Sequence, residues 1–246
     1  MAPVDRPDDL LRLEDLRVAH DGRVVLGPLT LDITARRTGI VGRNGSGKTT
    51  LARVVAGLQA PTAGRVTLSG IDPAKDRRGA LDRVGILFQN PDHQIIFPTV
   101  EEEITFGLRQ QGRSKAEAAA AVTAILTRFD KLHWRAAATH SLSQGQKQLV
   151  CLMAVLVMGP RWIVLDEPFS GLDIATRLQL MRHMARIEAR ILMISHDPES
   201  FAGYDRVIWL EGGALREDGP AAPVLARFTA QMRQWGDADD LSHLAG

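Results

Sequence analysis

Short apolar runs alternate along this chain with amphipathic stretches, a pattern typical of strands connected by helices. A helix is predicted at 48–58. Because strands that alternate with helices favour a mainly parallel sheet covered on both faces, we predict an α/β fold. The first strands are expected to form a separate antiparallel piece, and Glu211-Gly212-Gly213 predicts a hairpin turn. The predicted strands span 11–20, 24–34, 38–42, 65–70, 83–89, 161–167, 191–197 and 206–213.

The pattern becomes mostly helical from residue 99 to about 158. Thr99 with Glu102, and Ser114 with Glu117, have the spacing of capping boxes, and the alanine-rich stretch after Ser114 has high helix propensity. We therefore expect an inserted helical subdomain at about 91–158 within a single domain spanning 1–246. From about 229 the chain is a polar tail whose pattern does not decide between helix and loop.

Charge balance, aromatic content and the longest apolar run limit the functions that this chain is expected to have. The 246 residues include 30 basic and 29 acidic side chains, and with few aromatic residues nothing predicts a nucleic-acid partner. Cys151 lies in a ten-residue apolar run, so we expect a buried thiol and no disulfide framework. That run is shorter than the ~18 residues that a membrane span needs. Residues 1–9 do not resemble a signal peptide, so any membrane function is expected to use a partner.

GRNGSGKT, at 42–49, matches the phosphate-binding pattern G-x-x-x-x-G-K-[ST] between a predicted strand and a predicted helix. Glycines let backbone N–H groups turn toward phosphates, and the helix N-terminus adds favourable partial charge. Lys48 is expected at the β- and γ-phosphates and Thr49 at Mg²⁺. The predicted nucleotide-binding residues here are Gly42, Asn44, Gly45, Ser46, Gly47, Lys48, Thr49 and Thr50.

An acidic pair, Asp166 and Glu167, ends the apolar run 162–165, and open α/β sheets bind ligands at the carboxyl ends of their strands. Asp166 is expected to hold Mg²⁺, directly or through water, and Glu167 to orient or deprotonate the attacking water. The alternative is a pair that only solvates the strand end. Together with the phosphate loop, the pair indicates a P-loop NTPase and does not narrow the class further.

A third motif, Leu142-Ser143-Gln144-Gly145-Gln146, precedes Asp166 and opens a predicted helix. It resembles the LSGGQ signature of ABC ATPases, with Gln144 in place of the usual glycine. The resemblance implies that Ser143, Gly145 and Gln146 face the γ-phosphate of an ATP held by a second subunit. The alternative interpretation is a simple helix cap, with Ser143 at the N-cap and Gln146 three residues later.

The remaining ABC motifs follow in order, so the resemblance covers about residues 11–220. Gln89 matches the Q-loop glutamine and His196 matches the switch histidine. The D-loop, which crosses the dimer interface in that family, is matched by Ser170-Gly171-Leu172-Asp173. The resemblance implies a RecA-like core, ATP and Mg²⁺ as cofactors, and a homodimer with two active sites. Its implied catalytic residues are Glu167, His196 and Gln89, and its implied metal contacts are Thr49, Gln89 and Asp166. The family's adenine-stacking aromatic is His20 here; the alternative is a plain turn-flanking histidine.

The segment after Gln89 resembles the Q-loop extension of energy-coupling factor (ECF) ATPases, which import vitamins and transition-metal ions. Its NPDxQ element is matched by Asn90, Pro91, Asp92 and Gln94, which the resemblance places beside the groove for coupling helices of a transmembrane subunit. The acids at 101–103 crowd the first turn of a helix, where they suit its dipole. They either receive a basic coupling helix or only cap and solvate their own helix.

The resemblance implies a peripheral ATPase subunit at the cytoplasmic face of the cell membrane. Its implied partners are a second ATPase subunit, an integral membrane coupling subunit and a substrate-binding membrane protein. The chain ends soon after the core, as in the shorter ATPases of biotin-dedicated systems, so the expected cargo is a vitamin, biotin among them, or a metal ion. The alternatives are a general ABC importer ATPase and a soluble ABC ATPase of the cluster-assembly type, against which the NPDxQ element argues.

Overall fold

The computed structural model describes residues 10–237, and these divide into two compact units. Residues 10–75 and 191–237 form the first, which contains GRNGSGKT and is called here the phosphate-loop unit. Residues 76–190 form the second, which contains LSQGQ and is called the signature unit. Two stretches that are far apart in sequence thus build one unit, and one continuous segment builds the other.

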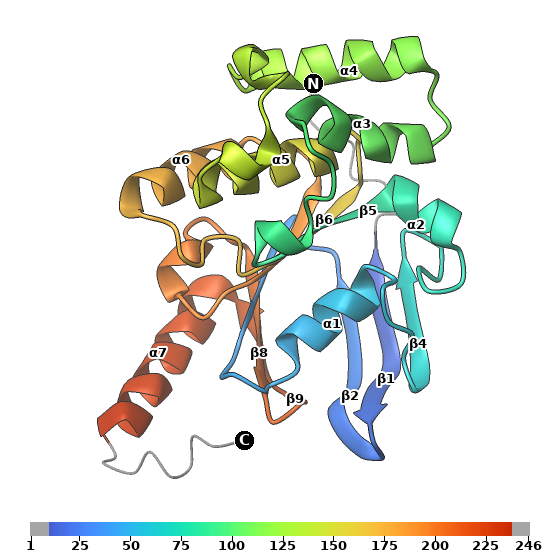
Figure 1. Cartoon of the computed structure of the whole chain (residues 1–246). Helices are drawn as coiled ribbons and strands as arrows, with labels where there is room; N and C mark the ends of the chain where they lie inside the picture. The colour runs from blue at the N-terminus through green and yellow to red at the C-terminus, as the bar shows by residue number, and fades with distance from the viewer. Residues whose placement is uncertain (1–9, 238–246) are drawn as a thin grey trace. The chain divides into compact units, whose positions relative to one another are not determined.

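An antiparallel sheet of three strands, in the order β2-β1-β4, opens the phosphate-loop unit. β1 (Leu11–His20) and β2 (Arg23–Ile33) are joined by Asp21 and Gly22, whose φ values of 50° and 77° are those of a type I′ turn. β1 also pairs antiparallel with β4 (Ala63–Leu68). The predicted separate antiparallel piece is therefore confirmed (Figure 1).

The same unit contains a second set of strands: β7 (Arg190–Ile194, from residue 191 on), β3 (Arg37–Val41), β8 (Arg206–Glu211) and β9 (Ala214–Pro220). β3 runs parallel to both β7 and β8, and most of its residues are buried, as expected for a central strand covered on both faces. β9 returns antiparallel to β8. Gly212 and Gly213 make the turn between them with φ values of 55° and 80°, which confirms the predicted hairpin.

Two helices complete this unit, α1 (Lys48–Val55) after the phosphate loop and α7 (Ala221–Asp237) after β9. Phe228 of α7 packs edge-on against Trp209 of β8, with ring centroids 5.3 Å apart. The sequence left helix and loop open for the polar tail from about 229, and the structure shows the helical alternative as far as residue 237. Residues 238–246 lie outside the described part of the chain.

The signature unit combines one parallel strand pair, β5 (Val84–Leu87) with β6 (Trp162–Asp166), and a group of helices. α3 packs against both α4 and α5 (Figure 1). The helices are α2 (Arg77–Arg83), α3 (Val100–Gln110), α4 (Lys115–Arg128), α5 (Gln144–Leu156) and α6 (Ile174–Ala185). Helices α3 to α5 fall within the predicted insertion at 91–158, whose boundaries as a subdomain remain a prediction.

The predicted helix caps are partly confirmed. Ser114 and Glu117 form a complete capping box, in which each side chain accepts the other residue's backbone N–H. Thr99 accepts the N–H of Glu102, but the Glu102 carboxylate accepts the Thr99 hydroxyl, at 2.6 Å, in place of its backbone N–H. The second box is therefore only half formed, because the hydroxyl lies closer to the carboxylate.

Element boundaries were less accurate than element types. The helix predicted at 48–58 ends at Val55, the strand predicted at 83–89 covers only 84–87, and the strand predicted at 191–197 ends at Ile194. The lost residues lie in turns or loops, except Arg83, which ends helix α2. Cys151, on α5, is fully buried, and burial raises the pKa of its thiol to about 12. The predicted buried thiol is confirmed.

Candidate functional site

The phosphate loop is held by hydrogen bonds to its own backbone. The Lys48 ammonium group donates to the carbonyl oxygens of Gly42, at 2.8 Å, and Arg43, at 2.7 Å. The Ser46 N–H also donates to the Arg43 carbonyl, at 3.2 Å. Lys48 is only 8% exposed, so its charge is fixed at one place inside the loop. The carbonyl of Arg43 is the shared acceptor on which this geometry depends.

Two glycines of this loop occupy positions that no other residue would fit. Gly42 has φ of 156°, and a Cβ there would lie 2.3 Å from the carbonyl oxygen of Leu210. Gly47 has φ of 89°, and its Cβ would lie 2.9 Å from the carbonyl oxygen of Val25. Both contacts are with backbone, which does not move aside. The pattern of glycines in the sequence is thus required by the packing of the loop.

The N-terminus of α1 is suited to an anion. Its N-cap residue is Gly47, which has no side chain to accept the first N–H groups, and no acidic residue stands in the first turn. The Ser46 hydroxyl is buried and has no hydrogen-bond partner among residues 10–237. The backbone N–H groups at the start of α1, a buried hydroxyl and the Lys48 ammonium group together form a cradle that suits a triphosphate.

The other predicted site residues of this unit lie at its surface. Asn44, Gly45 and Thr49 are exposed and Thr50 is half-buried. His196 is exposed in the loop that follows β7. His20, at the end of β1, is exposed, and its Nε2 lies 3.4 Å from Nε2 of Gln59. An exposed ring can stack on a base, but the same position also fits the turn-flanking alternative, so the role of His20 stays a prediction.

In the signature unit, the acidic pair sits where β6 ends. Asp166 is the last residue of the strand and is buried, whereas Glu167 is half-buried. Glu167 has φ of 49°, in the left-handed region that non-glycine residues seldom adopt. Strained backbone of this kind costs on the order of 1 kcal/mol and is concentrated at functional sites. The strain therefore favours the functional interpretation of Glu167 over that of a solvated strand end.

The signature residues form the cap of α5 and remain accessible. The Ser143 hydroxyl accepts the Gln146 N–H at 3.3 Å, and the Gln146 side chain accepts the Ser143 N–H at 2.8 Å. The capping interpretation of Ser143 and Gln146 is thus confirmed as local geometry. Ser143 and Gln144 are exposed, and Gly145 and Gln146 are half-buried. The cap orients the helix N-terminus without covering it.

Gln144, the departure from the family signature, has a partner of its own. Its side-chain N–H group lies 3.4 Å from the carbonyl oxygen of Ser170, in the D-loop. The Ser170 hydroxyl in turn accepts a hydrogen bond from the Gln89 side chain at 3.3 Å. Ser170 thus connects the Q-loop glutamine with the signature motif inside one unit. Sequence reasoning missed this bridge, since nothing in the spacing of the three residues indicates contact.

The D-loop ends in a helix cap. Asp173 accepts the backbone N–H of Thr176 at 2.9 Å and its hydroxyl at 2.6 Å, and these bonds lower the pKa of the Asp173 carboxyl. Asp173 is exposed, as its predicted place at a subunit interface requires.

The four predicted docking residues shape the segment that they belong to. Asn90 accepts the N–H of Asp92 at 2.9 Å, and Pro91 follows it as the buried first residue of a short 3-10 turn. Gln94 accepts the Phe88 N–H at 3.1 Å and donates to the Ile86 carbonyl at 3.3 Å. These bonds explain the residue types without a partner, so docking stays a prediction.

Two residues of α5 hold this segment and were missed from the sequence. The Lys147 ammonium group contacts the Asp92 carboxylate at 2.6 Å, and the Gln148 side chain donates to the Phe88 carbonyl at 3.2 Å. The available signal was the polar run Gln146-Lys147-Gln148, which precedes the apolar part of the helix. The signature helix therefore anchors the Q-loop extension.

The three acids of α3 all have partners within the signature unit. Arg135 pairs with Glu101 at 2.6 Å and lowers the pKa of that carboxyl. Glu102 accepts the Thr99 hydroxyl. The buried Glu103 accepts the N–H groups of residues 96 and 97, both at 3.0 Å. Their arrangement supports the local interpretation over that of a receptor for a basic helix.

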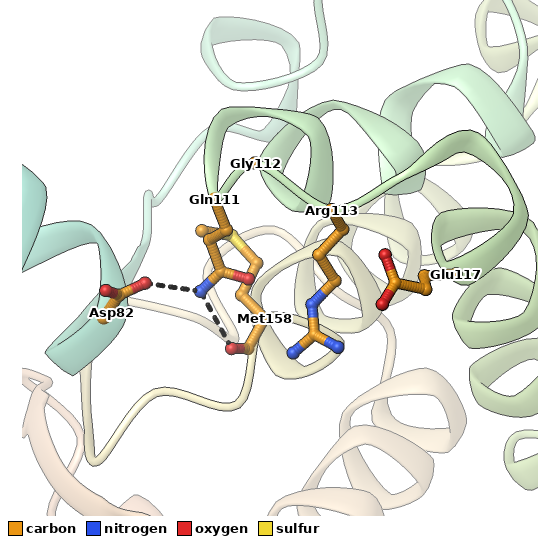
Figure 2. A pocket seen from close by; sticks show the side chains of 6 residues that line it. All are labelled: Asp82, Gln111, Gly112, Arg113, Glu117 and Met158. Carbon is orange, nitrogen blue, oxygen red and sulfur yellow. Dashed lines mark hydrogen bonds between the residues drawn. The ribbon is translucent and has the colours of Figure 1, made fainter.

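An open pocket of about 460 Å³ lies elsewhere in the signature unit. Figure 2 shows Gln111 closing one side of it, with its amide donating to the Asp82 carboxylate and the Met158 carbonyl, both at 3.1 Å. Gly112, Arg113 and Glu117 line the rest. None of the predicted nucleotide residues lines this pocket, so it is not the candidate ATP site.

The sequence matches the family model described as ABC transporter over residues 26–170. It is 50% identical over 214 residues to the biotin transport ATP-binding protein BioM of Rhodobacter capsulatus, which covers 87% of this chain and 92% of that protein. It is 36% identical over 221 residues to the energy-coupling factor transporter ATP-binding protein EcfA1 of Symbiobacterium thermophilum, over 86% of this chain and 74% of that protein.

Among solved structures, CbiO1 of Clostridium perfringens, part of the ABC transporter complex CbiONQ, superimposes with a TM-score of 0.76 at 28% identity. The superposition covers 95% of this chain and 97% of that chain. The chain therefore belongs to the ABC transporter family. Within that family it is an ATP-binding, ATP-hydrolysing subunit of the energy-coupling factor type, as the segment after Gln89 predicted. Among residues 10–237, no helix is both long and apolar enough to cross a lipid bilayer.

Proposed function

We propose that this chain hydrolyses MgATP in a homodimer and thereby powers the uptake of biotin through a membrane-embedded partner. The observation that carries the choice of substrate is the 50% identity to a biotin transport ATP-binding protein over most of both chains. The chain itself does not contact the vitamin in this proposal; it supplies the free energy of hydrolysis to subunits that do.

The phosphate loop binds the triphosphate. The Lys48 ammonium group, oriented by two loop carbonyls, contacts the β- and γ-phosphates, and the N–H groups at the start of α1 surround them. His20 stacks on the adenine. The first residues of α5 supply Ser143, Gly145 and Gln146 to the γ-phosphate held by the second copy, which their exposure permits.

The residues expected at Mg²⁺ suit that ion. A threonine hydroxyl from Thr49, a carboxylate from Asp166 and an amide oxygen from Gln89 are hard oxygen donors, and Mg²⁺ at phosphates takes few protein ligands. Asp166 is buried at a strand end, where an ion would compensate its charge. When bound, Mg²⁺ neutralises charge on the phosphate oxygens.

Hydrolysis requires a positioned water. The Glu167 carboxylate orients the water for in-line attack on the γ-phosphorus and accepts its proton, while His196 contacts the γ-phosphate and Gln89 contacts the water. Asp173 places the D-loop at the interface between copies. The positive φ of Glu167, 49°, supports this role, because strained backbone is concentrated at functional sites.

Within the transporter, the chain acts at the cytoplasmic face of the membrane. Asn90, Pro91, Asp92 and Gln94 contact the coupling subunit through the segment that α5 anchors. The proposed assembly contains a second copy of the chain, an integral membrane coupling subunit and a membrane protein that binds the substrate.

Co-purification from detergent-solubilised membranes tests this assembly. The chain is tagged, expressed from its own operon, and everything that co-elutes is identified. A small helical membrane scaffold with a separate biotin-binding membrane protein is the expected result. Two permease subunits with a periplasmic binding protein would replace the proposal by a general ABC importer. Recovery only from the soluble fraction, without membrane partners, would contradict the transport function and favour a cluster-assembly ATPase.

A further inference from the structure

Two arginines and two tryptophans form a stack that links the phosphate loop to the C-terminal helix. The Arg43 guanidinium lies 5.0 Å from the ring centroid of Trp235, on α7. The Arg216 guanidinium lies 5.7 Å from the same ring and 4.2 Å from the ring of Trp209. Two cations thus contact Trp235, and one of them belongs to the phosphate loop.

Trp209 and Arg216, which form the base of this stack, are held in place by neighbouring side chains. Trp209 is 2% exposed and packs edge-on against Phe228 of α7. Arg216 pairs with Glu211 and also donates to the Gln231 side chain at 3.0 Å. Arg216 is therefore held from strand β8 and from α7 together. Trp235 rests on this support, so the ring offers Arg43 a defined surface.

Within the phosphate loop, Arg43 is a residue whose backbone positions the Lys48 ammonium group. Its carbonyl oxygen accepts the Lys48 ammonium group at 2.7 Å and the Ser46 N–H at 3.2 Å. Fixing the side chain of Arg43 limits the movement of the peptide that carries this oxygen. The stack therefore connects Trp235 with the position of the Lys48 ammonium group.

We propose that Trp235 is a positioning residue for ATP binding, acting through Arg43 on Lys48. Trp235 lies outside residues 26–170, where the family model matches, so this role belongs to α7 and not to the shared motifs. The inference rests on the proposed function in one respect, that Lys48 contacts the phosphates. Partly exposed cation–π contacts are each worth a few-fold in an equilibrium constant.

The test compares variants of the full-length chain, purified with the partners that co-elute with it. Trp235→Ala is expected to raise the KM for ATP about threefold to fivefold while kcat stays within about twofold. Trp235→Phe keeps an aromatic face and is expected to restore most of the affinity. Arg233→Ala, an exposed residue on the same helix, is the matched control and should leave both constants unchanged.

A double-mutant cycle with Arg43→Ala separates positioning from general support of the fold. If Trp235 acts through Arg43, Trp235→Ala has no further effect on KM in the Arg43→Ala background. Equal effects in both backgrounds, or an unchanged KM with only a lowered Tm, would overturn the inference. Lys48→Ala separates a failure of the proposed function from a failure of this inference. If Lys48→Ala keeps its ATP affinity, the proposed function is contradicted. If Lys48→Ala loses affinity but Trp235→Ala binds ATP normally, only the role of Trp235 is contradicted.

Discussion

The phosphate loop and the signature segment are both glycine-containing helix N-termini, yet only the phosphate loop has its key side chains buried within the chain. In the phosphate loop, Lys48 and Ser46 are buried and the ammonium group is bound by carbonyls of the same loop. In the signature segment, Ser143 and Gln144 are exposed, and the polar groups of Ser143 and Gln146 satisfy one another. The phosphate loop is therefore a mostly buried binding site within one chain, whereas the signature segment is an exposed, preformed helix N-terminus.

In the proposed dimer, this difference assigns separate roles to the two copies. A buried lysine costs free energy unless it is paired, and an anionic ligand at the loop would add to the pairing that its carbonyls supply. The signature cap needs no ligand to be stable. It can therefore remain exposed before a second subunit brings the γ-phosphate to it. The two regions therefore predict different responses to perturbation.

The largest contrast is expected within helix α5 itself, between its exposed start and its buried middle. Burial raises the pKa of the Cys151 thiol to about 12, so at pH 8 only about one thiol in 10⁴ is ionised, and native protein should resist thiol reagents. Ser143→Cys adds a thiol at the exposed end and should react orders of magnitude faster. The measurement is the rate of absorbance change with a chromogenic disulfide. Rapid native labelling of Cys151 would contradict its burial.

Removing the proposed base separates hydrolysis from binding. Glu167→Gln is expected to lower kcat by about a hundredfold or more while ATP affinity is retained, because the amide cannot accept the proton of the attacking water. Light scattering should then detect a dimer that persists with MgATP. Glu188→Gln, an exposed carboxylate in the same unit, serves as the control. A variant that stays monomeric with MgATP would show that the signature surface is not completed by a second copy.

The cradle itself is tested by Lys48→Ala. Loss of the buried ammonium group is expected to weaken ATP binding at least tenfold, which corresponds to ~1.4 kcal/mol. Equilibrium titration with a fluorescent ATP analogue measures the change. Lys75→Ala, an exposed lysine of the same unit, should bind normally. Affinity retained within about twofold would remove Lys48 from its assigned role.

The smallest effect is expected at Gln144. Gln144→Gly restores the family residue but removes the hydrogen bond to Ser170, and a single exposed bond of this length contributes about 1 kcal/mol or less. We expect kcat to fall about twofold to fivefold with KM nearly unchanged. Gln144→Ala removes the same bond without adding glycine flexibility, and should give the same result. Unchanged steady-state kinetics in both variants would mean that the bridge is incidental.

Much of the fold followed from local pattern. The β1–β2 turn and the Gly212-Gly213 hairpin depend on short-range backbone preferences, and the α4 cap depends on residues three apart. Boundaries were harder, because β5 and β7 end where their pairing with neighbouring strands ends, and adjacent residues in the sequence do not reveal that point. The half-formed cap at Thr99 has the same origin, since a spacing cannot say which oxygen lies closest.

The sequence by itself determined the motifs, because phosphate binding and hydrolysis need particular residue types at particular spacings in a strand–loop–helix context. Only the tertiary structure decided which of these residues are buried, what Gln144 contacts, and that Lys147 and Gln148 anchor the segment after Gln89. It also placed Trp235 against Arg43, which is 192 residues away in the sequence. Such contacts depend on how the strands and helices pack, and no local spacing encodes that geometry.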